Sequence, residues 1–134
     1  MRGAAAQRVV VSVGASGIGA ATTARFLEED ARFAVPDRSD KAPQRIRTAL
    51  PALDLALHAD IADAESVRAA FEQIDRVKGE FDVLINNAGI SLLHPSLEIT
   101  PETWREVIDV TLIGIFLIGQ AATRRMLVGN GGAP

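Results

Sequence analysis

The sequence predicts an α/β fold: a doubly wound parallel sheet of about four strands, followed by one long helix. Three observations support this prediction. Short apolar runs alternate with helical segments from residue 8 to residue 85. A glycine-rich turn joins the first run to the first helix, and polar residues follow the later runs. Strands that alternate with helices imply right-handed crossovers, so the strands lie parallel with their carboxyl ends at one edge.

The composition is that of a single globular domain. The 134 residues are 48% hydrophobic and 23% charged, and this length suits at most one domain, residues 1–134. A net charge of -3 gives no electrostatic footprint for nucleic acid or for an anionic membrane. The absence of cysteine excludes disulfides and thiolate sites. Val107 to Ile118 is too short for a bilayer span, so we expect a soluble cytoplasmic protein.

The first strand, Arg8 to Val11, leads into a turn that opens a helix from Gly17 to about Asp30. At such a turn, backbone N–H groups and the positive end of the helix dipole face any approaching anion, and glycines let a pyrophosphate come close. On its own the turn could equally be a simple strand–helix connection. The candidate binding residues are Ser12, Gly14, Ala15, Ser16, Gly17, Ile18 and Gly19.

The second strand, Arg32 to Val35, ends in Pro36-Asp37-Arg38. Asp37 lies 18 positions after Gly19, near the spacing at which an acidic residue meets the adenosine ribose of a dinucleotide. A carboxylate there accepts hydrogen bonds from a free 2′-hydroxyl and repels a 2′-phosphate, so it favours NAD over NADP. The alternative is that Asp37 only caps a turn beside Pro36.

A short polar helix is expected between Ser39 and Ala52, followed by a third strand, Asp54 to His58. His58 has no second ligand at metal-site spacing, so we expect no metal. Asp63 is a suitable N-cap for the next helix. The apolar residues that follow the period of that helix are Val67, Ala70, Phe71, Ile74 and Val77.

The fourth strand, Phe81 to Ile85, is closed by Asn86-Asn87-Ala88-Gly89. Side-chain amides at a strand end can bridge neighbouring strands, and the Ala-Gly pair leaves room for a flat ligand. The same residues could form an ordinary turn. A site is favoured because ligands of parallel sheets bind at the carboxyl ends of the strands. The residues that would gather there are Gly14, Asp37, Asp60 and Asn87.

These segments, in this order, resemble the short-chain dehydrogenase/reductase family over nearly the whole chain. The resemblance implies an incomplete Rossmann-type sheet with strand order 3-2-1-4. It also implies an enzyme that reduces carbonyls or oxidises alcohols with NAD or NADP. Members of this type are usually cytoplasmic homodimers or homotetramers. The matching segments are Gly14-Ala15-Ser16-Gly17-Ile18-Gly19, Asp37-Arg38, Asp60-Ile61, Asn86-Asn87-Ala88-Gly89 and the helix from Pro101 to Phe116.

The resemblance also implies roles for single residues. The glycine turn would hold the pyrophosphate and Asp37 the adenosine ribose, with only Arg38 beside it to accept a phosphate. Asp60 and Ile61 would flank the adenine. The residues that would line the ribose and nicotinamide side are Asn87, Ala88 and Gly89.

The chain departs from the family pattern at several positions. Val13 puts a β-branched side chain where glycine lets the backbone bend, at a cost of about 1–3 kcal/mol if positive φ is needed there. Pro36 removes a backbone donor at the end of the second strand. Thr111 stands at the family's active-site asparagine and offers one hydroxyl in place of an amide's separate donor and acceptor.

No catalytic residue is assigned. The family's catalytic serine and Tyr-x-x-x-Lys segment would follow the turn after Met126, and this chain has no tyrosine. Hydride transfer to a carbonyl needs a proton donor, which the family takes from that tyrosine. His94 is more simply explained as a solvent-facing loop residue. We expect a truncated, inactive cofactor-binding half, with a small-molecule substrate only in a full-length form. The alternatives are a complete, non-catalytic dinucleotide-binding module and a remnant that binds nothing.

Self-association is expected at two surfaces. In the family a fifth strand lies beyond the fourth, so Phe81 to Ile85 would here be an edge with unpaired backbone groups. The long helix, residues 101–125, starts with Thr100 as N-cap and Pro101 in its first turn, and its middle is apolar on more than one face. In the family this helix also packs against its counterpart in a partner subunit.

Overall fold

The computed structural model describes residues 7–12, 17–29, 32–78 and 80–129. The elements along the chain are β1 (Arg8–Val11), α1 (Gly17–Leu27), β2 (Arg32–Asp37), α2 (Ala42–Ala49), β3 (Leu55–His58), α3 (Ala64–Lys78), β4 (Val83–Ile85), η1 (Ser96–Glu98), α4 (Pro101–Ile108), η2 (Asp109–Gly114) and α5 (Ile115–Gly129).

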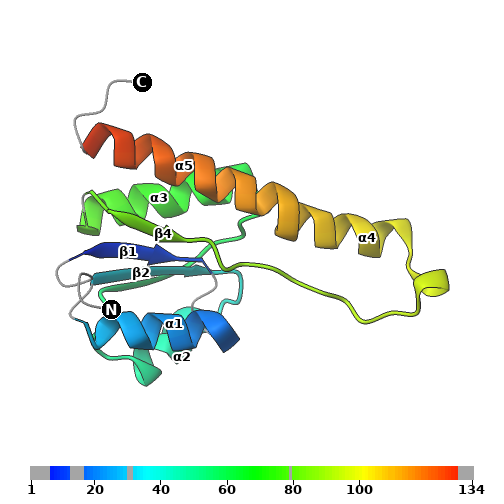
Figure 1. Ribbon diagram of the computed structural model, residues 1–134, viewed down its shortest axis with the longest axis horizontal. Coiled ribbons are helices and arrows are strands. Elements are labelled where there is room, and N and C mark those ends of the chain that lie inside the picture. The colour runs from blue at the N-terminus through cyan, green and yellow to red at the C-terminus, as the bar shows by residue number, and fades with distance from the viewer. Residues whose placement is uncertain (1–6, 13–16, 30–31, 79, 130–134) are drawn as a thin grey trace.

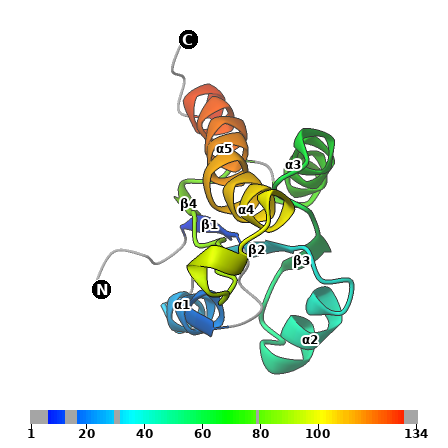
Figure 2. The same ribbon diagram turned by 90° about the vertical axis from the view of Figure 1, so that its right-hand side faces the viewer.

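The four strands form one parallel sheet in the order β3-β2-β1-β4, which confirms the predicted topology. Helices α1 and α2 cover one face of the sheet, and α3 and α5 cover the other (Figure 1). The carboxyl ends of all four strands therefore lie at one edge, which faces the viewer in Figure 2. Ligand sites of doubly wound sheets lie along this edge.

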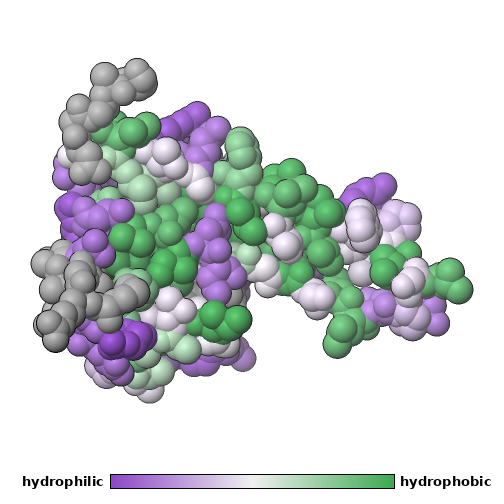
Figure 3. Space-filling view, viewed as in Figure 1, coloured by the Kyte–Doolittle hydropathy of each residue, from purple (hydrophilic) through white to green (hydrophobic). Residues whose placement is uncertain are grey.

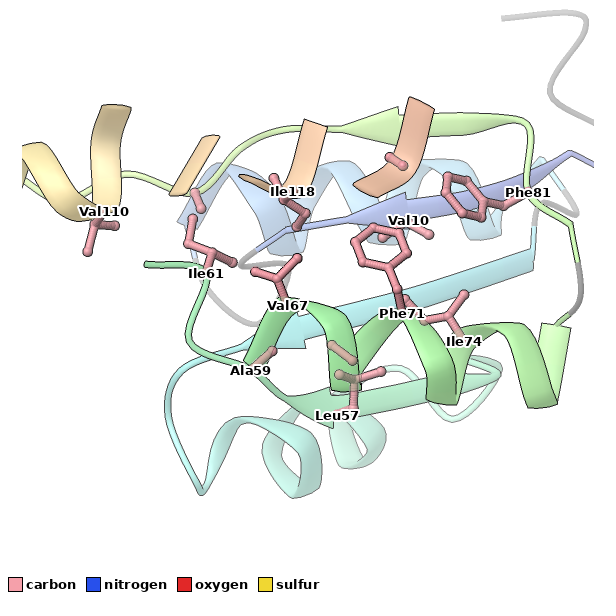
Figure 4. Close-up of a cluster of buried hydrophobic side chains, with 13 residues drawn as sticks. Val10, Leu57, Ala59, Ile61, Val67, Phe71, Ile74, Phe81, Val110 and Ile118 are labelled. Atoms are coloured by element: carbon pink, nitrogen blue, oxygen red, sulfur yellow. The ribbon is translucent and has the colours of Figure 1, made fainter. Parts of the chain in front are cut away.

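The inner strand β1 is buried on both faces. Val10 belongs to a core between the sheet and the α3–α5 layer, whereas Val9 and Val11 belong to a second core on the side of α1 and α2. In the first core the rings of Phe71 and Phe81 lie 5.7 Å apart (Figure 4). Each fully buried side chain of this size stabilises the fold by about 1.5–3 kcal/mol, so both helical layers are fixed to the sheet.

Helix α3 begins as predicted, because the Asp63 carboxylate accepts a hydrogen bond from the N–H of Glu65 at 3.0 Å. Its predicted apolar face is buried except at Val77, which is 58% exposed. At 100° per residue, position 77 falls at the margin of the apolar stripe. The period of the sequence therefore predicted the face correctly but not its width.

Several boundaries differ from the sequence prediction. Strand β4 begins at Val83 rather than at Phe81. Helix α1 ends at Leu27 rather than near Asp30. Strand β2 continues through Pro36 to Asp37 instead of ending at Val35. It continues because β3 still pairs with it, up to Asp37 opposite His58, after the pairing with β1 has ended at Ala34.

The long helix starts as predicted, with the Thr100 hydroxyl accepting from the N–H of Thr103 at 3.1 Å and Pro101 in the first turn. It runs to Gly129 rather than to residue 125, and the sequence did not predict its central π-helical segment, η2. From the sequence, the apolar segment Val107 to Ile118 was too short to span a bilayer. The whole helix, Pro101–Gly129, is long and apolar enough to cross a membrane, and 22% of its most apolar 18-residue window is buried. One such helix is weak evidence for a span, since core helices of soluble proteins pass the same test.

Candidate functional site

Ser12 joins the end of β1 to the end of β4. It is fully buried, and its hydroxyl oxygen accepts hydrogen bonds from the N–H groups of Asn87 and Ala88, both at 3.0 Å. The same hydroxyl donates to the side-chain oxygen of Asn86 at 3.3 Å. The proton and both lone pairs of Ser12 are therefore used inside the protein, and the side chain fixes the backbone at the end of β4.

Helix α1 begins at Gly17, which has free space around it among the described residues. Gly17 has a φ of +52°, and no described atom lies within 4 Å of the position that a Cβ would occupy there. A glycine adopts this conformation at little cost, and the first N–H groups of a helix have no partner within it. Ile18 is 80% exposed beside it, whereas Gly19 is buried. The remaining predicted turn residues, Gly14, Ala15 and Ser16, lie outside the described residues, as does Val13.

A pocket of about 350 Å³ lies between the ends of β2, β3 and β4; we call it the strand-end pocket. It brings together four of the residues that the sequence singled out. It also contains four that sequence reasoning missed, because apolar and small residues carry no motif of their own. The lining residues are Arg38, Ser39, Ala59, Asp60, Ile61, Gly89, Ile90 and Val110.

Asp60 is held at the wall of the strand-end pocket by its own loop. Its Oδ1 accepts from the N–H of Ala62 at 3.0 Å, and its N–H donates to the hydroxyl of Ser66 at 2.9 Å. Within the part of the chain that the structure describes, Oδ2 has no hydrogen-bond partner. This oxygen can accept a hydrogen bond from a ligand in the pocket.

Arg38 directly follows the last residue of β2, Asp37, whose side chain lies outside the described part. The Arg38 Nη2 atom lies 3.7 Å from Glu106 Oε1 on α4. Nearby, Asp40 Oδ1 lies 3.4 Å from His58 Nε2. A charged link therefore joins the end of β2 to α4 beside the strand-end pocket.

Thr111, on η2, holds the loop that follows β4. Its hydroxyl accepts from the N–H of Ile90 at 3.3 Å and donates to the carbonyl of the same residue at 3.2 Å. One hydroxyl thus acts as both donor and acceptor, which the sequence comparison with an asparagine did not anticipate. A Cβ on Gly89 would lie 4.0 Å from the Thr111 methyl group, so this glycine leaves its side of the loop open.

Asn86 connects the site to the long helix. Its amide donates to the carbonyl of Ile115 at 2.9 Å, immediately after η2. Ser12 and Asn86 together link β1, β4 and α5. The predicted bridging by amides at this strand end is therefore present.

A family model described as short chain dehydrogenase matches residues 7–133. The chain belongs to the short-chain dehydrogenase family.

Its relatives in this family include the D-threitol dehydrogenase of Mycolicibacterium smegmatis, 35% identical over 92% of this chain and 49% of the relative. The NAD-dependent glycerol dehydrogenase of Listeria innocua is 32% identical over 92% of this chain and 48% of its own. The fold matches the crystal structure of a short chain dehydrogenase from Mycobacterium smegmatis, with a TM-score of 0.81, 31% identity, and coverage of 90% of this chain and 52% of that one. The chain spans about half the length of the curated relatives that it matches.

Members of the short-chain dehydrogenase family bind a nicotinamide dinucleotide. The described residues fit such a cofactor at two places. The glycine at the start of α1 would admit a phosphate to helix N–H groups. The strand-end pocket combines apolar walls with the available Asp60 oxygen, as a nucleobase requires.

Proposed function

We propose that this chain binds a nicotinamide dinucleotide along the carboxyl ends of its strands, with NAD preferred to NADP. The whole protein would be an oxidoreductase that interconverts alcohols and carbonyls in the cytoplasm. The observation that carries this proposal is the convergence of the amino end of α1, the strand-end pocket and the Ser12-fixed end of β4 at one edge of the sheet.

The adenine would lie in the strand-end pocket, against Ile61 and with its amino group toward Asp60 Oδ2. The pyrophosphate would meet the N–H groups that begin at Gly17. The nicotinamide side would lie along Asn87, Ala88 and Gly89. Ser12 and Thr111 would not contact the cofactor. Their hydroxyls would position it indirectly, because they hold the backbone on either side of Gly89.

The preference for NAD rests on Asp37, which ends β2 next to the strand-end pocket. A carboxylate at this place accepts from a ribose hydroxyl and repels a 2′-phosphate. The relative from Listeria innocua is named an NAD-dependent enzyme, which supports the same choice. The relatives named for D-threitol and glycerol support a polyol as the substrate of the whole protein.

The dinucleotide would supply or accept the hydride. The 134 residues bind and orient it but include no tyrosine to serve as the proton donor. The activity of the whole protein therefore depends on an acid that these residues do not provide.

Cofactor choice can be measured through Trp104, the only tryptophan of the chain. We expect NADH to quench its fluorescence at lower concentration than NADPH does. Asp37→Ala should bring the affinities for NADH and NADPH closer together, because the repulsion of the 2′-phosphate is removed. Binding of NADPH that is tighter than that of NADH would contradict the preference, and the absence of binding of either would contradict the site.

A further inference from the structure

We propose that Glu106 is a cofactor-specificity residue, which acts by engaging Arg38 and so keeps that guanidinium from serving a 2′-phosphate. This inference rests on the proposed dinucleotide site. Glu106 lies in the family-like helix from Pro101 to Phe116, but the resemblance implies no role for it.

The geometry places the pair beside the strand-end pocket. Arg38 lines the pocket from the end of β2, and its Nη2 lies 3.7 Å from Glu106 Oε1. Val110, one helical turn after Glu106, lines the same pocket from the α4–η2 side. The pair therefore connects the end of β2, on one wall of the pocket, to the α4–η2 helix on the opposite wall.

The chemistry of the two groups gives the direction of the effect. A guanidinium binds phosphate oxygens well, and Arg38 is the cation next to Asp37 in the sequence. When a carboxylate already neutralises the guanidinium, the arginine offers less net positive charge to a phosphate. This loss of net positive charge weakens binding of a 2′-phosphate and leaves a free 2′-hydroxyl almost unaffected.

The fold does not depend on this pair. The two side chains are 54% and 49% exposed, and exposed pairs of this kind contribute little to stability. A neutral substitution should therefore leave the fold intact and change only the electrostatics beside the pocket.

The test compares 5′-AMP with adenosine 2′,5′-bisphosphate, two probes that differ only in the 2′-phosphate. We expect Glu106→Gln to improve the affinity for the bisphosphate relative to 5′-AMP by roughly twofold to fivefold at low salt, which is the range of an exposed charge pair. The matched control is Glu102→Gln, which removes the same charge one turn earlier on α4, where Glu102 lies 3.5 Å from Arg105. This control should leave the ratio of the two affinities unchanged.

A double substitution tests the route through Arg38. In an Arg38→Gln background, Glu106→Gln should no longer change the ratio. The inference is overturned if Glu106→Gln leaves the ratio of the two affinities unchanged, or if Glu102→Gln changes this ratio equally. It is also overturned if Glu106→Gln still improves the relative affinity for the bisphosphate in the Arg38→Gln background. If the unsubstituted chain binds 5′-AMP, these failures leave the proposed function standing. If it does not bind 5′-AMP, the proposed site is contradicted, and this inference is contradicted with it.

Discussion

Thr111 and Ile90 form a two-way hydrogen bond through a single oxygen atom, and this contact positions the backbone after Gly89. Thr111→Val keeps the shape of the side chain but leaves both backbone groups of Ile90 without this partner. Because these bonds are exposed and water can replace the hydroxyl, we expect it to lower the free energy of unfolding by only about 0.5–1 kcal/mol. We also expect it to weaken NADH binding, whereas Thr111→Ser retains both properties. Urea denaturation and NADH titration of the two variants measure this, and a valine variant that matches the parent in both would show that the hydroxyl has no positioning role.

Spacing along the sequence located the segments of the site but not the contacts between them. Asp60 and Ile61 could be predicted to share a site because they follow a strand in a family-like order, and the pocket contains both. The internal use of the Ser12 hydroxyl and the pairing of Arg38 with Glu106 could not be predicted. These contacts join residues far apart in the chain, and no local periodicity or propensity encodes them.

The π-helical segment η2 ends at Gly114, where the helix approaches Ile61 closely. A Cβ on this residue would lie 2.8 Å from Ile61 Cγ1 and 3.1 Å from the Ile61 carbonyl oxygen. Gly114→Ala should therefore destabilise the fold by about 1–3 kcal/mol and disturb Ile61 at the strand-end pocket. Gly119→Ala is the matched control on the same helix, because its Cβ would lie 3.9 Å from the Asn86 amide nitrogen, the nearest described atom outside the helix. Equal unfolding midpoints for the two alanine variants would contradict this account.

The sequence predicted the four strands because burial on both faces of a parallel sheet leaves continuous apolar runs. The family resemblance, and not the apolar runs, predicted the order of the strands. The sequence did not predict η2. The buried residues of the long helix recur every four positions, at Val110, Gly114, Ile118 and Ala122, which an ordinary helix pattern also accommodates. The π segment lies where this helix packs against the loop at Ile61, a contact between distant parts of the chain.

Arg8 and Asp82 fasten the amino ends of β1 and β4. The Asp82 carboxylate accepts from the Arg8 backbone N–H at 2.9 Å and from its guanidinium at 3.1 Å. These bonds lower the pKa of Asp82 below its ordinary value. A carboxyl group with a lower pKa in the folded state stabilises the fold above its unfolded pKa of about 3.9, and this contribution disappears as the pH falls.

Asp82→Asn should accordingly reduce the free energy of unfolding near neutral pH by about 1 kcal/mol at most, because the pair is partly exposed. The difference between variant and parent should shrink in acid. Urea denaturation across this pH range gives the result, and a difference that grows as the pH falls would contradict the assigned cause.

At the scale of the whole molecule, two surfaces favour self-association. Strand β4 ends the described sheet, and apolar residues gather on this face and along the long helix (Figure 3). Leu112 and Phe116 on that helix are 61% and 59% exposed. We expect the 134-residue chain to self-associate at micromolar concentration in sedimentation velocity, and Phe116→Glu to weaken the association. A single sharp monomer boundary for the unsubstituted chain would refute this prediction.

The 134-residue chain should show no turnover with alcohols or carbonyls, because it lacks a tyrosine to serve as the acid. An absorbance assay for NADH oxidation or formation tests this. Turnover that disappears in a His94→Ala variant would instead identify His94 as the proton donor.

The central claim, a dinucleotide bound along the carboxyl ends of the strands, is tested most directly by hydrogen–deuterium exchange with and without NADH. The claim predicts slower exchange in the peptides that contain Gly17 to Gly19, Arg38 and Ser39, Asp60 and Ile61, and Asn86 to Ile90, with no change at the amino ends of the strands. Unchanged exchange at these four segments under saturating NADH, or protection confined to another surface, would contradict it.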